Sequence, residues 1–420
     1  MLRGQTLKYR IVYRQELSRQ LRYNIAMIRP HSRRLHPNIQ LIAWFNFLLD
    51  LRFYAPILIL YFAQVTGSFV LGMSLFSVTM LSAAVLEIPT GVLSDRLGRK
   101  QTLVVGAVSA LLAVMFYAIG AGYWALALGA LLEGLSRALF SGNNDALLHD
   151  SLLEHGNEHE FAEYSGKTES MSQVAIAVVS ILGGIIAFYS FTLVMYLSLL
   201  PALAGVFVAL LIREPNIDTQ KNEGNIYLHL GQALRLFWAN KKLRLLSLSS
   251  MIGYSQSEAG YQFRSAFFAT LWPVWAIGIA KALGSVGAAA SFWFAGALIK
   301  RFGEFVVVLM SKGYSIVTNI ISTIMPGVWS PLIMSSNSLF FGSASTASSA
   351  LKQKEYSQHQ RATMASLDSL GGSAMYGLVA ILLGLVADAW SPATGILALQ
   401  SLAFVSMLIT WYLYRTDKQA

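Results

Sequence analysis

A small set of ionisable side chains lies inside long apolar segments of the sequence, and these are the residues that could do chemistry. Carboxyl groups occur there at Asp50, Glu87, Glu133 and Glu258. A charged side chain in such surroundings costs about 2.5–3.5 kcal/mol on membrane-insertion scales, so it is rarely present without a role. A buried carboxyl group that takes up and releases protons is what a proton carrier needs. We therefore predict that these four residues are candidates for proton coupling.

Basic and polar side chains accompany these carboxyl groups. Glu133 and Arg137 are four residues apart, so on a helix they share one face and can form an ion pair, which is either functional or a structural pair that neutralises its own charge. Asp50 is two residues from Arg52 and points elsewhere on a helix, which leaves its carboxyl group freer to titrate. The polar residues of the apolar segments also include Tyr254, Tyr261, Gln262 and Asn337.

The elements that hold these residues are long apolar segments. The sequence is 55% hydrophobic and 12% charged, whereas soluble proteins contain about 25% charged residues. Segments of about 20 apolar residues can cross the bilayer as helices, and the period-2 alternation of a membrane β-barrel is absent. We predict an all-α integral membrane protein. Its twelve transmembrane helices are expected at 39–62, 70–93, 102–119, 122–143, 171–189, 191–212, 243–264, 272–299, 304–325, 328–350, 366–388 and 392–413.

The predicted spans divide into two six-helix halves, 39–212 and 241–420, joined by a polar cytoplasmic linker at 213–240. Residues 1–38 are basic, with apolar residues near helical spacing, and resemble a helix that lies on a membrane surface and contacts its lipids. An alternative is that translation begins at Met27 and that the preceding residues are not native. The formal charge of +10 does not indicate nucleic acid, because the basic residues fall in particular loops.

The placement of Lys and Arg predicts the orientation of the chain. Basic residues occupy alternate connections, and the positive-inside rule then places both termini and the linker in the cytoplasm, with the spans in the cell (inner) membrane. Arg264 and Lys281 lie toward the ends of their spans, where we expect them to snorkel to the surface. The sequence has no cysteine, and we predict neither a disulfide nor a metal site.

A Gly-x-Leu-x-x-Arg-x-Gly run occurs once in each half, after the second and the eighth span. Small glycines let such a connection turn tightly. In the first copy Asp95 can face the N-terminus of span eleven, which has a partial positive charge, while the basic residues contact anionic lipid, pair with acids, or only set the topology. In the second copy Lys300 replaces the acid, and we expect Lys300 and Arg301 to contact the acidic connection at 150–163, the alternative being a solvated charged helix. The residues of the two loops are Gly91, Asp95, Arg96, Gly98, Arg99, Lys100, Gly296, Lys300, Arg301 and Gly303.

These loops resemble the signature loop of the major facilitator superfamily, which matches 91–100 nearly position by position. Glu87, Pro89, Thr90 and Gly91 also resemble the Glu-x-Pro-Thr-Gly run of multidrug-efflux-like and uncharacterised members. The fourth-span arginine motif of the family is only loosely met, and its fifth-span antiporter motif is not met. The resemblance implies two pseudo-symmetric halves and a central cavity lined by spans one, four, seven and ten. It makes Arg52, Arg137, Tyr254, Tyr261, Gln262 and Asn337 candidates for lining that cavity.

The resemblance further implies secondary active transport by alternating access. We expect a monomer without a cofactor, driven by a proton gradient, that exports a small amphipathic or drug-like molecule. The alternatives are uptake of a metabolite, a non-transporting sensor or lipid flippase on the same scaffold, and a membrane-embedded enzyme. The last is disfavoured because the sequence has no His-Glu-x-x-His run, no Gly-x-Ser-x-Gly elbow and no phosphate loop.

Overall fold

The computed structural model describes residues 37–216, 237–238, 240–356 and 361–418. The predicted N-terminal segment, apart from 37 and 38, and most of the predicted linker therefore lie outside the described residues. The part of the chain that is described forms helices and contains no β-strand. Ten of these helical segments are long and apolar enough to cross a membrane. Two further segments, which are more polar than these ten, complete the twelve predicted spans. They are α11 (Lys241–Phe268) and the pair of α14 (Ser330–Ser335) and α15 (Ser338–Glu355).

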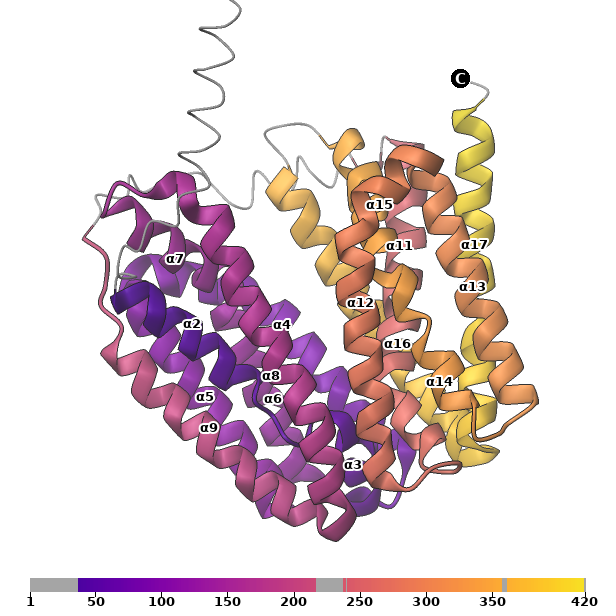
Figure 1. The fold of residues 1–420 in the computed structure, drawn as a ribbon, viewed down its shortest axis with the longest axis horizontal. Coiled ribbons are helices and arrows are strands. Elements are labelled where there is room, and N and C mark those ends of the chain that lie inside the picture. The colour runs from indigo at the N-terminus through magenta and orange to yellow at the C-terminus, as the bar shows by residue number, and fades with distance from the viewer. Residues whose placement is uncertain (1–36, 217–236, 239, 357–360, 419–420) are drawn as a thin grey trace, which may run out of the picture.

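The helices form two groups, which Figure 1 shows leaning together at one end and apart at the end where the chain terminates. We call the latter end the C-terminal side and the other the opposite side. The first group contains α2 (Pro37–Asp50), α3 (Leu58–Thr66), α4 (Phe69–Leu97), α5 (Arg99–Ile119), α6 (Tyr123–Phe140), α7 (Asn143–Leu153), α8 (Phe161–Tyr189) and α9 (Phe191–Leu211). The second contains α11, α12 (Val274–Phe302), α13 (Glu304–Ile324), α14, α15, α16 (Arg361–Ala389) and α17 (Pro392–Asp417).

Side-chain caps begin several spans. Ser68, Ser190 and Ser391 each accept a hydrogen bond from the backbone N–H three residues later, at distances of 3.3, 3.2 and 3.1 Å. Such caps satisfy N–H groups that the first turn of a helix leaves without a partner. Because all three serines lie in short connections on the opposite side, they set the start of α4, α9 and α17 there.

The first and the tenth predicted spans are interrupted. In place of one helix at 39–62, the chain ends α2 at Asp50, passes through a 3-10 turn, Ala55–Ile57, and continues as α3. Pro56 in that turn has no backbone N–H to donate, and the Arg52 guanidinium donates to the carbonyl of Leu49 at 2.8 Å. In span ten the helix breaks between α14 and α15, next to Asn337. Irregular backbone inside a membrane is tolerated where protein groups satisfy it.

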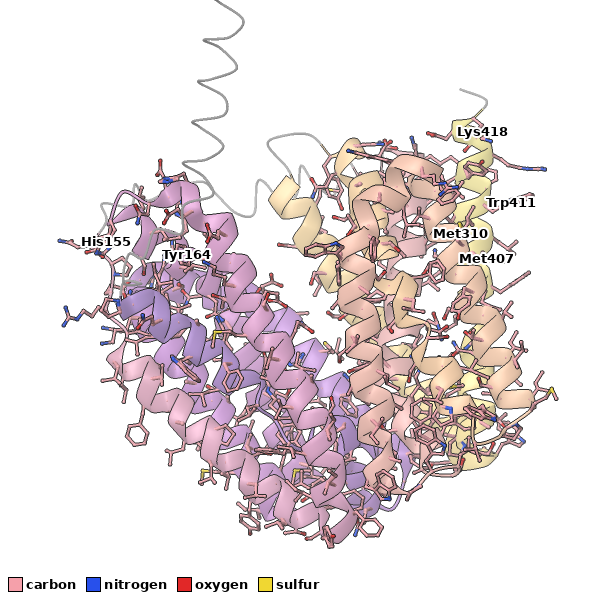
Figure 2. All side chains as sticks on the ribbon, viewed as in Figure 1. His155, Tyr164, Met310, Met407, Trp411 and Lys418 are labelled. Atoms are coloured by element: carbon pink, nitrogen blue, oxygen red, sulfur yellow. The ribbon has the colours of Figure 1, made fainter. Side chains whose placement is uncertain are left out.

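The outer surfaces of the helix groups are apolar. Figure 2 shows Met407 and Trp411 on the outer face of α17, on the side of the molecule away from the first group. Trp411 is 44% exposed in the isolated chain, and the Arg415 guanidinium lies 4.2 Å from the centre of its ring. An aromatic ring next to a basic residue near the end of a span is typical of the boundary between lipid and water.

Candidate functional site

A cavity with a volume of about 110 Å³ lies between the two helix groups. The residues from the first group include Arg52, Tyr54, Thr79, Tyr117, Glu133, Arg137 and Ser180, and those from the second are Tyr261, Gln262 and Lys281. The break in span one is what brings Arg52 to this place, because the backbone leaves the helix one residue earlier. The cavity is therefore lined by both charged and aromatic side chains.

Glu133 is the centre of a charged cluster in the first group. Its Oε1 accepts from the guanidinium of Arg52 at 2.9 Å and from that of Arg137 at 2.9 Å, so the ion pair predicted from the i, i+4 spacing is present. The hydroxyl of Tyr117 donates to Oε2 at 2.9 Å. Glu133 is only 6% exposed, and both of its oxygens have partners. Such an arrangement holds the carboxylate in its charged form.

Glu258 has a different environment on α11. Its Oε1 accepts from the amide of Gln262 at 2.8 Å, and within the described residues no Lys or Arg forms an ion pair with it. Gln262 itself lines the cavity, so Glu258 lies directly behind the wall. Tyr254, one turn earlier, is 43% exposed and packs against Gly372 of α16. Glu258 is thus the carboxylate near the cavity that no cation holds.

Several predicted residues lie away from the cavity lining. Asp50 ends α2 and is half-buried, Glu87 is half-buried in α4, and Tyr254 faces α16. Asn337 was predicted to line the cavity, but its amide donates to Asn319 of α13 at 3.1 Å and its oxygen accepts from Thr318. The interruption of span ten turns Asn337 toward its own helix group, so its predicted place in the cavity lining was wrong. The hydroxyl of Tyr254 lies 3.9 Å from the sulfur of Met80, which lines the cavity.

The expected snorkelling of Lys281 was also wrong. Lys281 lies two turns inside α12, is 6% exposed and lines the cavity. Its ammonium donates to the carbonyl oxygen of Tyr261 at 2.7 Å and lies 3.7 Å from the centre of that ring. Sequence reasoning placed Lys281 near the end of its span, whereas about 10 Å of helix separates Lys281 from the start of α12. That distance along the helix was the signal that it missed. Arg264, on α11, is half-buried.

The repeated loops are shorter than predicted. Gly91 and Gly296 lie inside α4 and α12, and the turn is made at Gly98 and Gly303 alone, with φ of 93° and 81°. Glycine adopts these angles without strain. Gly98 also contacts the carboxylate of Glu214, which accepts from the next two backbone N–H groups at 2.8 and 2.6 Å and so caps α5.

The charged residues of the loops are distributed differently in the two copies. Arg99 forms an ion pair with Asp150 of α7, which occupies part of the acidic connection that we expected Lys300 and Arg301 to contact. Lys300 and Arg301 are exposed and, among the described residues, form no ion pair with that connection. The side chain of Asp95 lies outside the described residues, and the side chain of Arg96 is exposed. The two helix groups lean apart on this side, so that α12 ends away from α7 (Figure 1).

On the opposite side the groups are joined. The carboxylate of Asp388, near the end of α16, accepts from the hydroxyl of Ser68 at 2.5 Å and from the N–H groups of Phe69 and Val70 at 2.7 and 2.9 Å. Ser77 donates to the carbonyl of Gly377 at 3.0 Å. These bonds use the first half of α4 and the last half of α16, so they close the cavity on the opposite side.

A second pair of helices closes the same side. A Cβ added at Gly278 of α12 would clash with the carbonyl oxygen of Ser180 in α8, and one added at Gly184 of α8 would lie 2.9 Å from the carbonyl oxygen of Trp275. Glycines let two membrane helices approach this closely. The groups thus touch through α4 with α16 and through α8 with α12.

The comparisons with known proteins agree with this architecture. The model of a family described as Major Facilitator Superfamily matches residues 41–378. The solved structure of the nucleoside transporter NupG has a TM-score of 0.76 at 15% identity and covers 91% of this chain and 99% of that chain. A D-xylose-proton symporter has a TM-score of 0.72 at 13% identity, with coverage of 90% and 97%.

A bacterial homolog of the human lysosomal transporter Spinster, in an inward-facing and unoccupied conformation, has a TM-score of 0.68 at 15% identity, with coverage of 90% and 96%. No curated protein sequence matches the chain. At these identities the structural likeness shows the fold alone, whereas the family model covers most of the sequence. The chain belongs to the Major Facilitator Superfamily and is a multi-pass membrane transporter, not an enzyme.

Proposed function

We propose that this protein is a proton-coupled secondary transporter in which Glu258 binds the coupling proton. The observation behind this proposal is the contrast between two carboxylates at one cavity. Glu133 accepts four hydrogen bonds from Arg52, Arg137 and Tyr117, so protonating it would weaken bonds to its charged form and leave two arginines without a counterion. Among the described residues Glu258 bonds the neutral amide of Gln262 and no cation, so a proton on it would leave no cation there unpaired.

We infer that the C-terminal side is cytoplasmic, because the basic connections lie on that side and the positive-inside rule places them inside. Both termini are then cytoplasmic, and in a bacterium the membrane is the inner one. With the opposite side closed by Asp388 and by the α8 and α12 glycines, this conformation faces the cytoplasm. The alternate state requires α4 and α16 to separate on the outer side and to close on the inner side.

The substrate in this proposal is a small polar molecule that binds between the two groups. The charged lining supports a polar substrate more than the drug-like compound expected from the Glu-x-Pro-Thr-Gly run. Two structural neighbours, one named a nucleoside transporter and the other a D-xylose-proton symporter, support the same choice. Uptake is the second candidate for the direction of transport, and export is the direction that the sequence resemblance predicts. The protein is proposed to work as a monomer in contact with membrane lipids.

The experiment uses purified full-length protein in proteoliposomes that enclose a pH-sensitive dye. A panel of nucleosides, sugars, organic acids and amphipathic drugs is added with the pH gradient imposed in either orientation. Proton movement that follows addition of a compound identifies it as a substrate, and the sign of the pH change separates symport from antiport. If transport of every compound in the panel were indifferent to the gradient, proton coupling would be refuted.

A further inference from the structure

We propose that the substrate is a small organic anion whose carboxylate binds Lys281 on the second helix group, with Arg264 of the same group adding positive charge behind it. This inference rests on the proposed transport function and specifies the class of molecule that the same cavity accepts. It follows from the charges of the two groups, the unused donors of the basic residues and the aromatic side chains around them.

The charge of the cavity lining does not balance. Its cations are Arg52, Arg137 and Lys281, and its only carboxylate is Glu133. Glu133 bonds both arginines and forms no ion pair with Lys281, whose ammonium bonds the carbonyl of Tyr261 instead. Buried charges are normally paired because an unpaired ion in a low-dielectric site is costly. The carboxylate nearest in charge to Lys281 is that of Glu258, which lies within its electrostatic reach but forms no ion pair with it among the described residues.

The two groups contribute similar sets of charges with different pairing. Around the cavity each has one carboxylate and two basic residues, Glu133 with Arg52 and Arg137 in the first group, and Glu258 with Arg264 and Lys281 in the second. In the first group all three are bonded together. In the second, Glu258 bonds Gln262, and neither basic residue forms an ion pair among the described residues. The cations of the first group thus share a carboxylate, whereas those of the second form no ion pair among the described residues and are the better candidates to bind an anionic ligand.

The donors of the second group are mostly unused. An ammonium has three N–H donors, and that of Lys281 uses one for the carbonyl of Tyr261 at 2.7 Å. A guanidinium has five donors, and that of Arg264 makes no hydrogen bond to the described residues. Arg264 lies within electrostatic reach of Lys281. The ammonium of Lys281, with two donors left and Arg264 adding to the positive charge, is complementary to a ligand carboxylate.

The other residues of the cavity lining suit a ligand with a planar ring. Tyr54, Phe62, Phe76, Tyr117 and Tyr261 line the same cavity. Aromatic side chains supply apolar contact area for a ring, and the Tyr261 ring lies beside the Lys281 ammonium. A ring that bears a carboxylate would contact both features at once, whereas a cationic or neutral compound would leave the positive charge unpaired.

The test compares acids with their amides, which have nearly the same shape and no charge. Purified full-length protein in detergent is mixed with benzoate, nicotinate, phenylacetate or indole-3-acetate, or with the matching amide, at equal sodium concentration, and Tm is followed by tryptophan fluorescence. A ligand that binds the folded state raises Tm in a concentration-dependent way. We expect at least one acid to raise Tm saturably and its amide to have no effect. If none of the four acids raised Tm more than its matching amide did, the inference would be overturned.

Variants then locate the site. Lys281→Met and Arg264→Gln are each expected to weaken binding of the effective acid at least tenfold, while Lys281→Arg keeps the cation and retains most of the binding. Lys312→Met is the matched control, because Lys312 is a second lysine inside the second group that bonds Ser249, Ser406 and Thr410 away from the cavity. Unchanged affinity in both Lys281→Met and Arg264→Gln would overturn the assignment. If Lys281→Met does not fold, Lys281→Arg provides the test, because a cation at this position is expected to retain most of the binding.

The two proposals fail separately. Acid binding by this assay needs no gradient, so it persists if Glu258 is not the proton carrier. Conversely, if the protein moved protons together with a neutral substrate, Glu258 would still be supported as the proton carrier, while the proposed anion site would be refuted.

Discussion

The carboxylate of Asp388 accepts a hydrogen bond from the hydroxyl of Ser68, with 2.5 Å between the two oxygens, and joins the end of α16 to the start of α4. The same carboxylate also accepts from the first two N–H groups of α4. A carboxylate is favourable at a helix N-terminus because of the partial positive charge there. α4 and α16 run in opposite directions, so Asp95, near the end of α4, lies on the side where α16 begins.

The first prediction concerns this outer contact. Asp388→Asn removes a charge that accepts three hydrogen bonds, each worth about 1.5–3 kcal/mol when the acceptor is charged, so we expect the outward-facing population to rise at least tenfold. Ser68→Ala removes one of the bonds and should have a smaller effect in the same direction. Because the chain has no cysteine, Thr79→Cys in the cavity gives a single label site. Its labelling by an impermeant maleimide from outside measures the change, and an unaltered rate would show that Asp388 does not hold this side closed.

The second prediction uses the close approach of α8 and α12. Gly278→Ala places a methyl group against the carbonyl of Ser180, so the helices must separate by a few tenths of an ångström or more. We expect faster labelling of Thr79→Cys from outside and a lower Tm. Gly284→Ala on the same helix is the control, since a Cβ there meets nothing within 4 Å. Equal behaviour of the two alanine variants would contradict the proposed role of this contact.

The third prediction concerns the charged cluster around Glu133. Glu133→Gln leaves Arg52 and Arg137 without their common counterion, and breaking a buried pair costs about 3–5 kcal/mol. We expect a marked fall in Tm in detergent. The double variant Glu133→Gln with Arg52→Gln removes one of the unpaired charges and should recover part of the loss. A single variant as stable as the wild type would mean that the cluster contributes nothing to folding.

The fourth prediction concerns Lys312, which lies among α11, α13 and α17. Its ammonium donates to Ser249 at 2.8 Å, to the Ser406 hydroxyl at 2.7 Å and to Thr410 at 2.8 Å, with no carboxylate among these partners. Ser406→Ala removes one of these acceptors, and leaving a charged donor under-satisfied costs about 1–3 kcal/mol. Lys312→Met replaces the charge by an apolar side chain of similar length and should be neutral or stabilising in thermal unfolding. A Lys312→Met variant less stable than Ser406→Ala would reverse this account.

Much of the fold was predictable because apolar length decides membrane spans. The predicted spans 102–119 and 191–212 correspond to α5 and α9, and the division between halves falls between α9 and α11. The interruption of span one was not predicted, because a window of hydropathy averages over Asp50, Arg52 and Pro56. The bond from Arg52 to Glu133, which the break makes possible, joins residues far apart in sequence and has no spacing rule.

The site was predictable only where partners share a helix. The pair of Glu133 with Arg137 followed from the i, i+4 rule, and it is present at 2.9 Å. Lys281 and Asp388 were missed because their roles depend on contacts between elements, with Tyr261 for one and Ser68 for the other. The loop glycines show the same limit, since the repeat identified the connection but not that Gly91 would remain helical while Gly98 makes the turn.

The most direct test of the account is proton movement driven by substrate in proteoliposomes of Glu258→Gln, with Glu87→Gln as the control. Both residues are half-buried glutamates on spans, but only Glu258 lies behind the cavity wall through Gln262. We predict that Glu258→Gln still exchanges substrate across the membrane without a gradient but no longer moves protons with it or accumulates substrate under an imposed pH gradient, while Glu87→Gln behaves as the wild type. Gradient-driven accumulation that is intact in Glu258→Gln would contradict the central claim.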